Sequence, residues 1–432
     1  MKTGGVSIAV MAMLVPCAFA AQSSMVDESA DRLFQAGQFV RAAEQYAQLV
    51  AANPNDYLAV LGLGRIALLS NKFKDAEKYL ETAIALRPSE TDPKVMLAQT
   101  FYRQDKFEQA AASLDGIDVS TNVLIKEQYP TLNVAQLQSF AGQTPYEVHG
   151  GQTAYVRFLQ TDPLPLISVR VNGGQEVTFF IDTGASVVAL DSDFAKELGI
   201  PQFGSTQGTF AGGQTAEVTA GRIESLTLGS WTVKNLPVAT LPLRQINLGP
   251  TRIDGVIGTT LFYHFLATMD YRHGELVLRR KNAKSHRAFA EESDDRVAVP
   301  FWVASDHFMV ALGRVETLPP TQLFIDTGLA DAGVKLAESV IKQGGITLEE
   351  DKATIGQGAG NGTLTIVPYT VHHVSLGAIQ EENVRGLFDG PFPWENTFGF
   401  HLAGMVGHEF FRPYAVTFDF TNMEIDLEKR SK

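Results

Sequence analysis

Apolar and polar residues follow a helical period over residues 29–115, and the whole pattern recurs every 34 residues. Three aromatic positions keep this spacing, namely Phe39, Phe73 and Phe107. An alanine stands three positions after each of them, a short polar turn precedes each, and Pro54 and Pro88 are also 34 residues apart. Apolar positions at helical spacing, with turns and prolines at fixed offsets, predict successive pairs of helices.

The 34-residue helix-turn-helix unit resembles the tetratricopeptide repeat. This resemblance predicts an all-α domain of about three repeats over residues 26–117, which is about the smallest number that buries a continuous core. Such arrays usually present a concave surface to a peptide or protein, so we expect a protein partner for the repeats. The alternative is that the array only spaces or stabilises the domain on its C-terminal side.

Turn residues interrupt the helical pattern repeatedly between residues 118 and 163. We predict one last helix near 133–141, then irregular chain and the first strands of a β domain. Residues 118–163 are therefore interpreted as a connecting segment.

A second internal repeat fills the remainder, in short runs of Val, Ile, Phe and Thr that predict β-strands. An apolar strand followed by Asp-Thr-Gly occurs at Asp182 and again at Asp326, 144 residues later. An apolar pair followed by glycine comes 76 residues after the first aspartate, at Gly258, and 81 residues after the second, at Gly407. A glycine-rich stretch lies between the two marks in each copy.

These matches predict two copies of one β lobe, at residues 164–284 and 296–430. The charged residues 285–295 between them are interpreted as a linker. The expected fold class is thus multidomain, with helical repeats followed by an all-β, bilobal domain that has pseudo-twofold symmetry.

Composition narrows the classes of function. The 432 residues are 45% hydrophobic and 19% charged, as expected for a globular chain of about three domains. A formal net charge of -13 without a long Lys/Arg run argues against a nucleic-acid partner. The single cysteine excludes a disulfide framework and a multi-cysteine metal site.

Residues 1–21 have the features of a signal peptide. Lys2 precedes an apolar run that ends in Ala-Phe-Ala at 18–20, which is a small-x-small cleavage pattern. The run of about 15 residues is short for a membrane span, so we expect its removal and no span in the mature chain. The segment looks like a bacterial Sec signal, which implies a periplasmic or secreted protein. Two alternatives are an uncleaved anchor and lipidation at Cys17, whose preceding residues faintly resemble a lipobox.

The paired Asp-Thr-Gly motifs, the apolar-apolar-Gly segments and the glycine-rich stretches together resemble a retropepsin-like aspartic protease of the pepsin and retropepsin clan. Residues 164–430 would hold both lobes, and Asp-Thr-Gly-Ala-Ser at 182–186 is close to the retropepsin form of the motif. With the repeats, the chain resembles secreted bacterial proteins that combine tetratricopeptide repeats with an aspartyl protease. The resemblance implies an aspartic-type endopeptidase that acts on a protein or peptide. It also implies no cofactor, and a monomer, since both lobes lie in one chain.

Two carboxyl groups suffice for this chemistry. Carboxylates about 3 Å apart can share one proton, because both cannot ionise together. The ionised group takes a proton from water while the protonated group polarises the scissile carbonyl. The resemblance assigns these catalytic roles to Asp182 and Asp326.

The resemblance also implies supporting residues and flaps. Hydroxyls of both motif threonines would bond across the axis, the glycines would place N–H donors near the carboxyls, and Ser186 would bond near Asp182. The residues expected to support the dyad are Thr183, Gly184, Ser186, Thr327 and Gly328. The residues expected to form flaps that close over an extended peptide are Thr209, Phe210, Ala211 and Gly212 in one lobe and Gly358, Ala359 and Gly360 in the other.

Leu329 departs from the pattern, because the family usually has a small residue after the glycine. We expect it to alter the packing or polarity around Asp326, and the alternative function is therefore a weak or inactive, protease-like protein that binds peptides or serves as a scaffold. No metal site is expected. His372 and His373 would point to opposite faces of a strand, and His408 lacks the second histidine of a zinc-protease helix.

Overall fold

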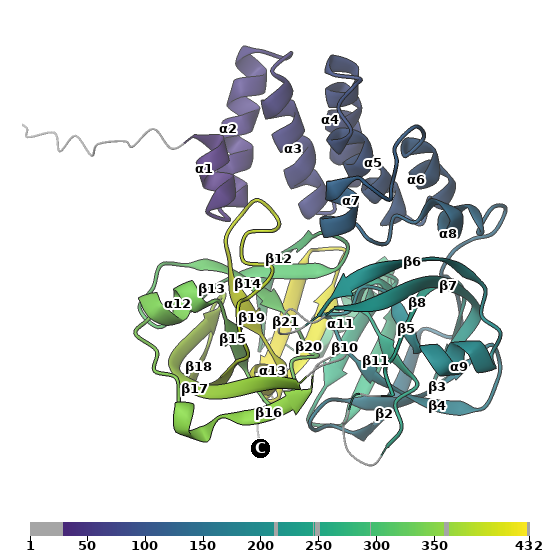
Figure 1. The fold of residues 1–432 in the computed structure, drawn as a ribbon, viewed down its shortest axis with the longest axis vertical. Coiled ribbons are helices and arrows are strands. Elements are labelled where there is room, and N and C mark those ends of the chain that lie inside the picture. The colour runs from purple at the N-terminus through teal and green to yellow at the C-terminus, as the bar shows by residue number, and fades with distance from the viewer. Residues whose placement is uncertain are drawn as a thin grey trace, which may run out of the picture.

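The structure is a computed structural model that describes residues 29–210, 215–244, 246, 251–293, 295–357 and 363–429, without the side chains of Thr209, Gln357 and Thr363. The expected signal peptide, residues 1–21, lies outside this part of the chain. Helices stand above a larger β-rich domain with two lobes (Figure 1). The predicted fold class is confirmed. Among the helices described, none is both long and apolar enough to cross a membrane.

Paired helices form the array, as the 34-residue period predicts. They are α1 (Ala30–Gln35), α2 (Phe39–Ala52), α3 (Tyr57–Leu69), α4 (Phe73–Leu86), α5 (Asp92–Tyr102) and α6 (Phe107–Ser113). Asp56 caps α3 by accepting the Ala59 N–H at 3.1 Å. The repeated alanines Ala42, Ala76 and Ala110 are 0% exposed, because a methyl group there lets neighbouring helices approach closely.

Two short helices, α7 (Val123–Gln128) and α8 (Val134–Gln138), follow the array. The second lies within the helix predicted near 133–141, whereas α7 has no counterpart in the prediction. Strands β1 (Glu147–His149) and β2 (Thr153–Gln160) also lie in the predicted connecting segment. β1 pairs with a strand of the first lobe and β2 with two such strands, so the β domain begins before residue 164.

A six-stranded antiparallel sheet joins the two lobes. Its order is β2, β11 (Glu275–Arg280), β10 (Phe265–Asp270), β20 (Tyr414–Asp419), β21 (Glu424–Lys429) and β12 (Arg296–Ala304). The pseudo-twofold axis passes between β10 and β20, where the hydroxyl oxygens of Thr268 and Thr417 are 2.7 Å apart. The internal sequence repeat thus becomes the symmetry of the domain.

Each lobe adds its own curved sheet and short helices. Lobe 1 contains β3 (Leu166–Val171), β4 (Glu176–Ile181), β5 (Val188–Asp191), α9 (Ser192–Glu197), β6 (Gln202–Thr209), β7 (Thr215–Leu228), β8 (Trp231–Leu241), β9 (Gly255–Ile257) and α10 (Thr259–Phe262). Lobe 2 contains β13 (Phe308–Val315), β14 (Thr321–Ile325), β15 (Val334–Leu336), α12 (Glu338–Gln343), η2 (Glu350–Lys352), β16 (Thr354–Gln357), β17 (Thr363–Leu376), β18 (Ile379–Phe388), β19 (Leu402–Val406) and α13 (His408–Phe411).

Most of the predicted linker 285–295 is helical, since α11 spans Ala283–Glu292. Its Phe289 is buried, with the Arg296 guanidinium 3.8 Å from the ring centre. The connection therefore packs on the domain as an amphipathic helix. The charges that suggest a linker lie on its solvent-exposed face.

Aromatic side chains fasten the array to lobe 2. The Phe39 ring centre lies 5.2 Å from that of Trp302 and 5.0 Å from that of Phe400, and Phe39 is 1% exposed. The Gln322 amide, also buried, donates to the Gly37 carbonyl at 2.8 Å. The array is thus part of one continuous core with the β domain.

The array side also contacts lobe 1. The Gln136 amide of α8 donates to the carbonyls of Gly221 at 2.6 Å and Val238 at 3.1 Å. His264 lies 3.0 Å from the Asp105 carboxylate in the last repeat turn. Since both lobes are held, the repeats have a fixed orientation relative to the domain below.

We expect Phe39→Leu to destabilise the chain by about 1–2 kcal/mol, because the smaller side chain underfills a contact with two aromatic rings. Phe73→Leu is the matched control, since Phe73 occupies the same repeat position but is only half-buried. Urea denaturation of both variants measures the difference. Equal losses would contradict a specific role of Phe39 at the contact between the array and lobe 2.

Candidate active site

Two Asp-Thr-Gly loops face each other at the pseudo-twofold axis. Each follows a buried strand, β4 in lobe 1 and β14 in lobe 2. Parallel pairing with β9 and β19 holds these strands, and the Asp182 and Asp326 N–H groups donate to carbonyls at 3.0 and 2.9 Å in the same segments. The predicted apolar-apolar-Gly segments therefore lie directly beside the aspartate loops.

Hydrogen bonds between threonines join the two loops. The Thr183 hydroxyl donates to the Ile325 carbonyl at 2.9 Å and accepts the Thr327 N–H at 2.9 Å. The Thr327 hydroxyl accepts the Thr183 N–H at 3.0 Å. Both threonines are 0% exposed, so water cannot replace these bonds. This network fixes the spacing of the two carboxyl groups.

The glycines of the motifs leave room for the opposite carboxyl. A Cβ on Gly184 would lie 2.6 Å from an oxygen of Asp326, and one on Gly328 would overlap Asp182. Each glycine N–H also donates to the aspartate of its own loop, at 2.7 Å in lobe 1 and 2.9 Å in lobe 2. Glycine is required here because two carboxyls occupy the space of its missing side chain.

Both aspartates are half-buried, and a carboxylate oxygen of each lies close to the position that a Cβ on Gly184 would occupy, at 2.6 Å for Asp326 and 2.9 Å for Asp182. Burial raises the pKa of Asp182, and the hydrogen bond from Asp326 offsets part of that rise. Burial also raises the pKa of Asp326, and the neighbouring Asp182 charge raises it well above its usual range. The pair therefore retains one proton over a range of pH in which isolated aspartates are ionised.

Ser186 of the first aspartate loop forms a hydrogen bond to the other lobe. Its hydroxyl donates at 2.9 Å to Asp306, which is 0% exposed and lies in the turn between β12 and β13 of the other lobe. The sequence predicts a hydrogen bond of this serine near Asp182 without naming its partner. The tertiary structure offers it a buried carboxylate from the opposite lobe, and a charged acceptor is the stronger partner.

The Leu329 N–H donates to the Asp326 carbonyl at 3.3 Å, and the side chain is buried. It is 9% exposed and packs against Gly407, where a Cβ would come within 2.6 Å of its methyl group. The side chain fills the core below the loop, and the predicted disturbance around Asp326 has no counterpart in the hydrogen bonds of that loop. The loop accommodates leucine because a glycine faces it.

The predicted flaps are the ends of two hairpins, β6–β7 and β16–β17. Phe210 is half-buried in an apolar cluster that also includes Ala185 and Ala330, one from each aspartate loop. Side-chain positions of Thr209 are not described. The other predicted flap residues lie outside the described residues, namely Ala211, Gly212, Gly358, Ala359 and Gly360.

Two further aspartates that the motifs do not predict also join the lobes here. Asp162 and Asp306 are 144 residues apart, as the dyad aspartates are, and each precedes its aspartate by 20 positions. Asp162 contacts His408 at 3.1 Å and Arg412 at 3.0 Å. The shared offset is the signal in the sequence that could have found the pair.

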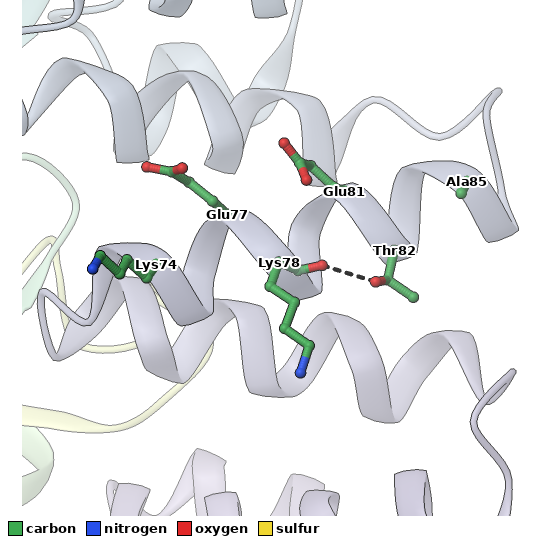
Figure 2. Close-up of a pocket in the computed structure, with 6 residues that line it drawn as sticks. All are labelled: Lys74, Glu77, Lys78, Glu81, Thr82 and Ala85. Carbon is green, nitrogen blue, oxygen red and sulfur yellow. Dashed lines mark hydrogen bonds between the residues drawn. The ribbon is translucent and has the colours of Figure 1, made fainter.

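A surface cavity on α4 does not compete with the dyad as a catalytic site (Figure 2). It is lined by alternating charges and small residues, namely Lys74, Glu77, Lys78, Glu81, Thr82 and Ala85. Glu77 is already paired with Lys106 at 3.2 Å. Over the described residues, no group of three or more His, Cys, Asp or Glu side chains could hold a metal ion.

Parts of the chain are similar to known protein families and structures. Residues 167–261 match a family described as aspartyl protease, and residues 28–91 and 67–120 match two families described as tetratricopeptide repeat. Among solved structures, the aspartic proteinase from Irpex lacteus is similar, with 14% sequence identity, a TM-score of 0.41 and coverage of 65% of this chain and 98% of that one. No curated protein sequence matches the chain.

The family match places an aspartyl protease domain in lobe 1, and lobe 2 repeats its aspartate loop with hydrogen bonds across the axis. The chain as a whole combines this domain with tetratricopeptide repeats.

Proposed function

We propose that the protein is an aspartic endopeptidase that hydrolyses peptide bonds at the Asp182–Asp326 dyad. The observation that carries the proposal is the close approach of these two carboxyls across the lobe axis, where the threonine hydrogen bonds hold their loops together. Two acids in one site with one proton between them are suited to general acid–base hydrolysis.

In this mechanism a water molecule binds between the carboxyls. The ionised carboxyl accepts a proton from the water, whose oxygen attacks the scissile carbonyl carbon. The protonated carboxyl of the pair donates toward the carbonyl oxygen as negative charge develops there. Collapse of the tetrahedral intermediate needs a proton on the leaving amine, and the dyad can return the one taken from water.

Hydrolysis of a quenched-fluorescent peptide library by the chain from residue 22 onward, between pH 3 and 8, tests the proposal. Cleavage by the wild type supports an endopeptidase and identifies the bond it prefers. Peptide binding without turnover at any pH would instead support a non-catalytic peptide-binding protein. The same assay on a chain that starts at residue 145 asks whether the preceding segments must be present.

We expect a bell-shaped dependence of kcat/KM on pH. Activity rises as pH passes the lower pKa of the pair, because one carboxyl must ionise, and falls as pH passes the upper pKa, because the second proton is lost. Burial raises the pKa of both groups, so the maximum lies at weakly acidic rather than strongly acidic pH. A profile that still rises toward pH 3 would contradict this assignment.

We further propose that the repeats bind the protein substrate or a regulatory partner, and that the protein acts in the periplasm or after secretion. The first proposal is supported by the interaction role usual for such repeats. The second is supported by the expected signal peptide. Subcellular fractionation of cells that produce the full chain, with the mature N-terminus determined by mass spectrometry, tests the location.

A further inference from the structure

Arg103 connects the array to the turn between β12 and β13. It lies at the C-terminal end of α5 and is 7% exposed. One guanidinium nitrogen donates to the Leu68 carbonyl at 2.8 Å and to Asn71 at 3.0 Å, inside the array. The second terminal nitrogen, Nη2, donates to the Val303 carbonyl at 3.0 Å and to the Ser305 carbonyl, both in the β domain. The planar guanidinium of Arg103 therefore donates hydrogen bonds to both domains at once.

The turn that Arg103 holds has an unusual backbone. Ser305 has φ of +56°, a left-handed conformation that residues other than glycine rarely adopt. Its hydroxyl donates to the Gln128 carbonyl of α7, and the residue is 4% exposed. Such a conformation persists when its surroundings determine it, and here the surroundings include two segments on the array side.

The next residue of the turn reaches the dyad loop. Asp306 accepts the Ser186 hydroxyl at 2.9 Å, and its backbone carbonyl accepts the Tyr263 hydroxyl at 2.6 Å. Both donors belong to lobe 1, although Asp306 belongs to lobe 2. Ser186 comes four positions after Asp182, within the same loop.

The equivalent turn of lobe 1 provides an internal comparison. Asp162 there occupies the position of Asp306 in the repeat, yet its side chain is 51% exposed, against 0% for Asp306. The array covers the lobe 2 turn, and a buried carboxylate needs the several donors that surround Asp306. The array thus contributes to one of the two equivalent contacts between lobes.

We propose that Arg103 is a positioning residue for catalysis, which sets the Asp182 loop through Ser305, Asp306 and Ser186. The tetratricopeptide array is then a structural part of the active site as well as a surface for partners. This inference rests on the proposed peptidase function.

Arg103→Lys tests the proposal, with Arg65→Lys as the matched control. Arg65 is also an arginine of the array that donates to the β domain, but its acceptor is the Phe398 carbonyl, in a different loop. Lysine keeps the charge and loses the fork. We expect Arg103→Lys to lower kcat about 10- to 100-fold with KM changed less than about twofold, because the dyad is displaced rather than the substrate site.

Ser186→Ala removes the last hydrogen bond in the series from Arg103 to the dyad loop, namely that to Asp306, and leaves the array unchanged. A double-mutant cycle should show that Ser186→Ala adds little to Arg103→Lys, since both break one pathway. Hydrogen exchange of the peptide that covers residues 182–190 is the second readout. It should accelerate in Arg103→Lys and remain at the wild-type rate in Arg65→Lys.

Unchanged kcat and unchanged exchange in folded Arg103→Lys would overturn the inference, and so would fully multiplicative losses in the double mutant. If Arg103→Lys does not fold, Ser186→Ala decides alone: wild-type kcat overturns the proposal and a loss in kcat supports it. If the wild type hydrolyses no peptide, the proposed function fails. Hydrogen exchange of residues 182–190 in Arg103→Lys and Arg65→Lys then tests the link from Arg103 to the dyad loop without any measurement of turnover.

Discussion

We expect Asp182→Asn and Asp326→Asn each to lower kcat by at least about 10³-fold, since each removes one of the two groups that transfer protons. The amides keep the size of the carboxyls, so the threonine network and the fold should persist. Hydrolysis of the preferred library peptide, followed at the optimum pH, measures the effect. Comparison of melting temperatures with the wild type shows whether each variant is folded.

Asp193→Asn is the matched control for this experiment. Asp193 lies in lobe 1, close along the chain to the dyad loop, but its side chain is 68% exposed. We expect its kcat to equal that of the wild type. Retention of activity in either dyad variant would exclude the proposed mechanism, even if the chain proved to be a peptidase by another route.

The second large effect concerns the hydrogen bonds beneath the dyad. We expect Thr183→Val to destabilise the chain by about 2–4 kcal/mol, because the Ile325 carbonyl and the Thr327 N–H would lose their buried partner. We also expect kcat to fall about 100-fold, since the loops would no longer hold the carboxyls in one geometry. Urea denaturation and steady-state kinetics measure the two effects separately.

Thr183→Ser is the conservative control, because serine keeps the hydroxyl and removes only a methyl group. It should retain most of both stability and activity. A serine variant as impaired as the valine variant would show that packing of the methyl group, rather than the hydrogen bonds, is what the position requires.

Much of the candidate site could be predicted because it repeats. The offset of 144 residues between Asp182 and Asp326 pairs the two loops, and the glycines after each aspartate predict close approach. Both predictions concern short segments whose function depends on a local motif. The structure brings these segments together with the hydrogen bonds that the family resemblance implies.

The sequence is less informative about packing and hydrogen-bond partners, which depend on residues that become neighbours only in the folded chain. Leu329 stands out in the sequence, yet it packs below the loop against Gly407. The resemblance implies a hydrogen bond for Ser186 near Asp182, but only the structure identifies its acceptor as Asp306 of the other lobe. Burial and the choice of hydrogen-bond partner are properties of surfaces that meet only after folding, so no local pattern contains them.

The class of the protein can be derived from its sequence alone. Helical periodicity repeated every 34 residues specifies paired helices, and two strand-Asp-Thr-Gly copies specify two related lobes, because hydrophobic period and turn chemistry act over a few residues. The tertiary structure was needed to show that the array packs on both lobes and that Arg103 reaches the turn beside the dyad. Those contacts join residues about 200 positions apart, such as Arg103 and Ser305, and depend on how complete domains fit together.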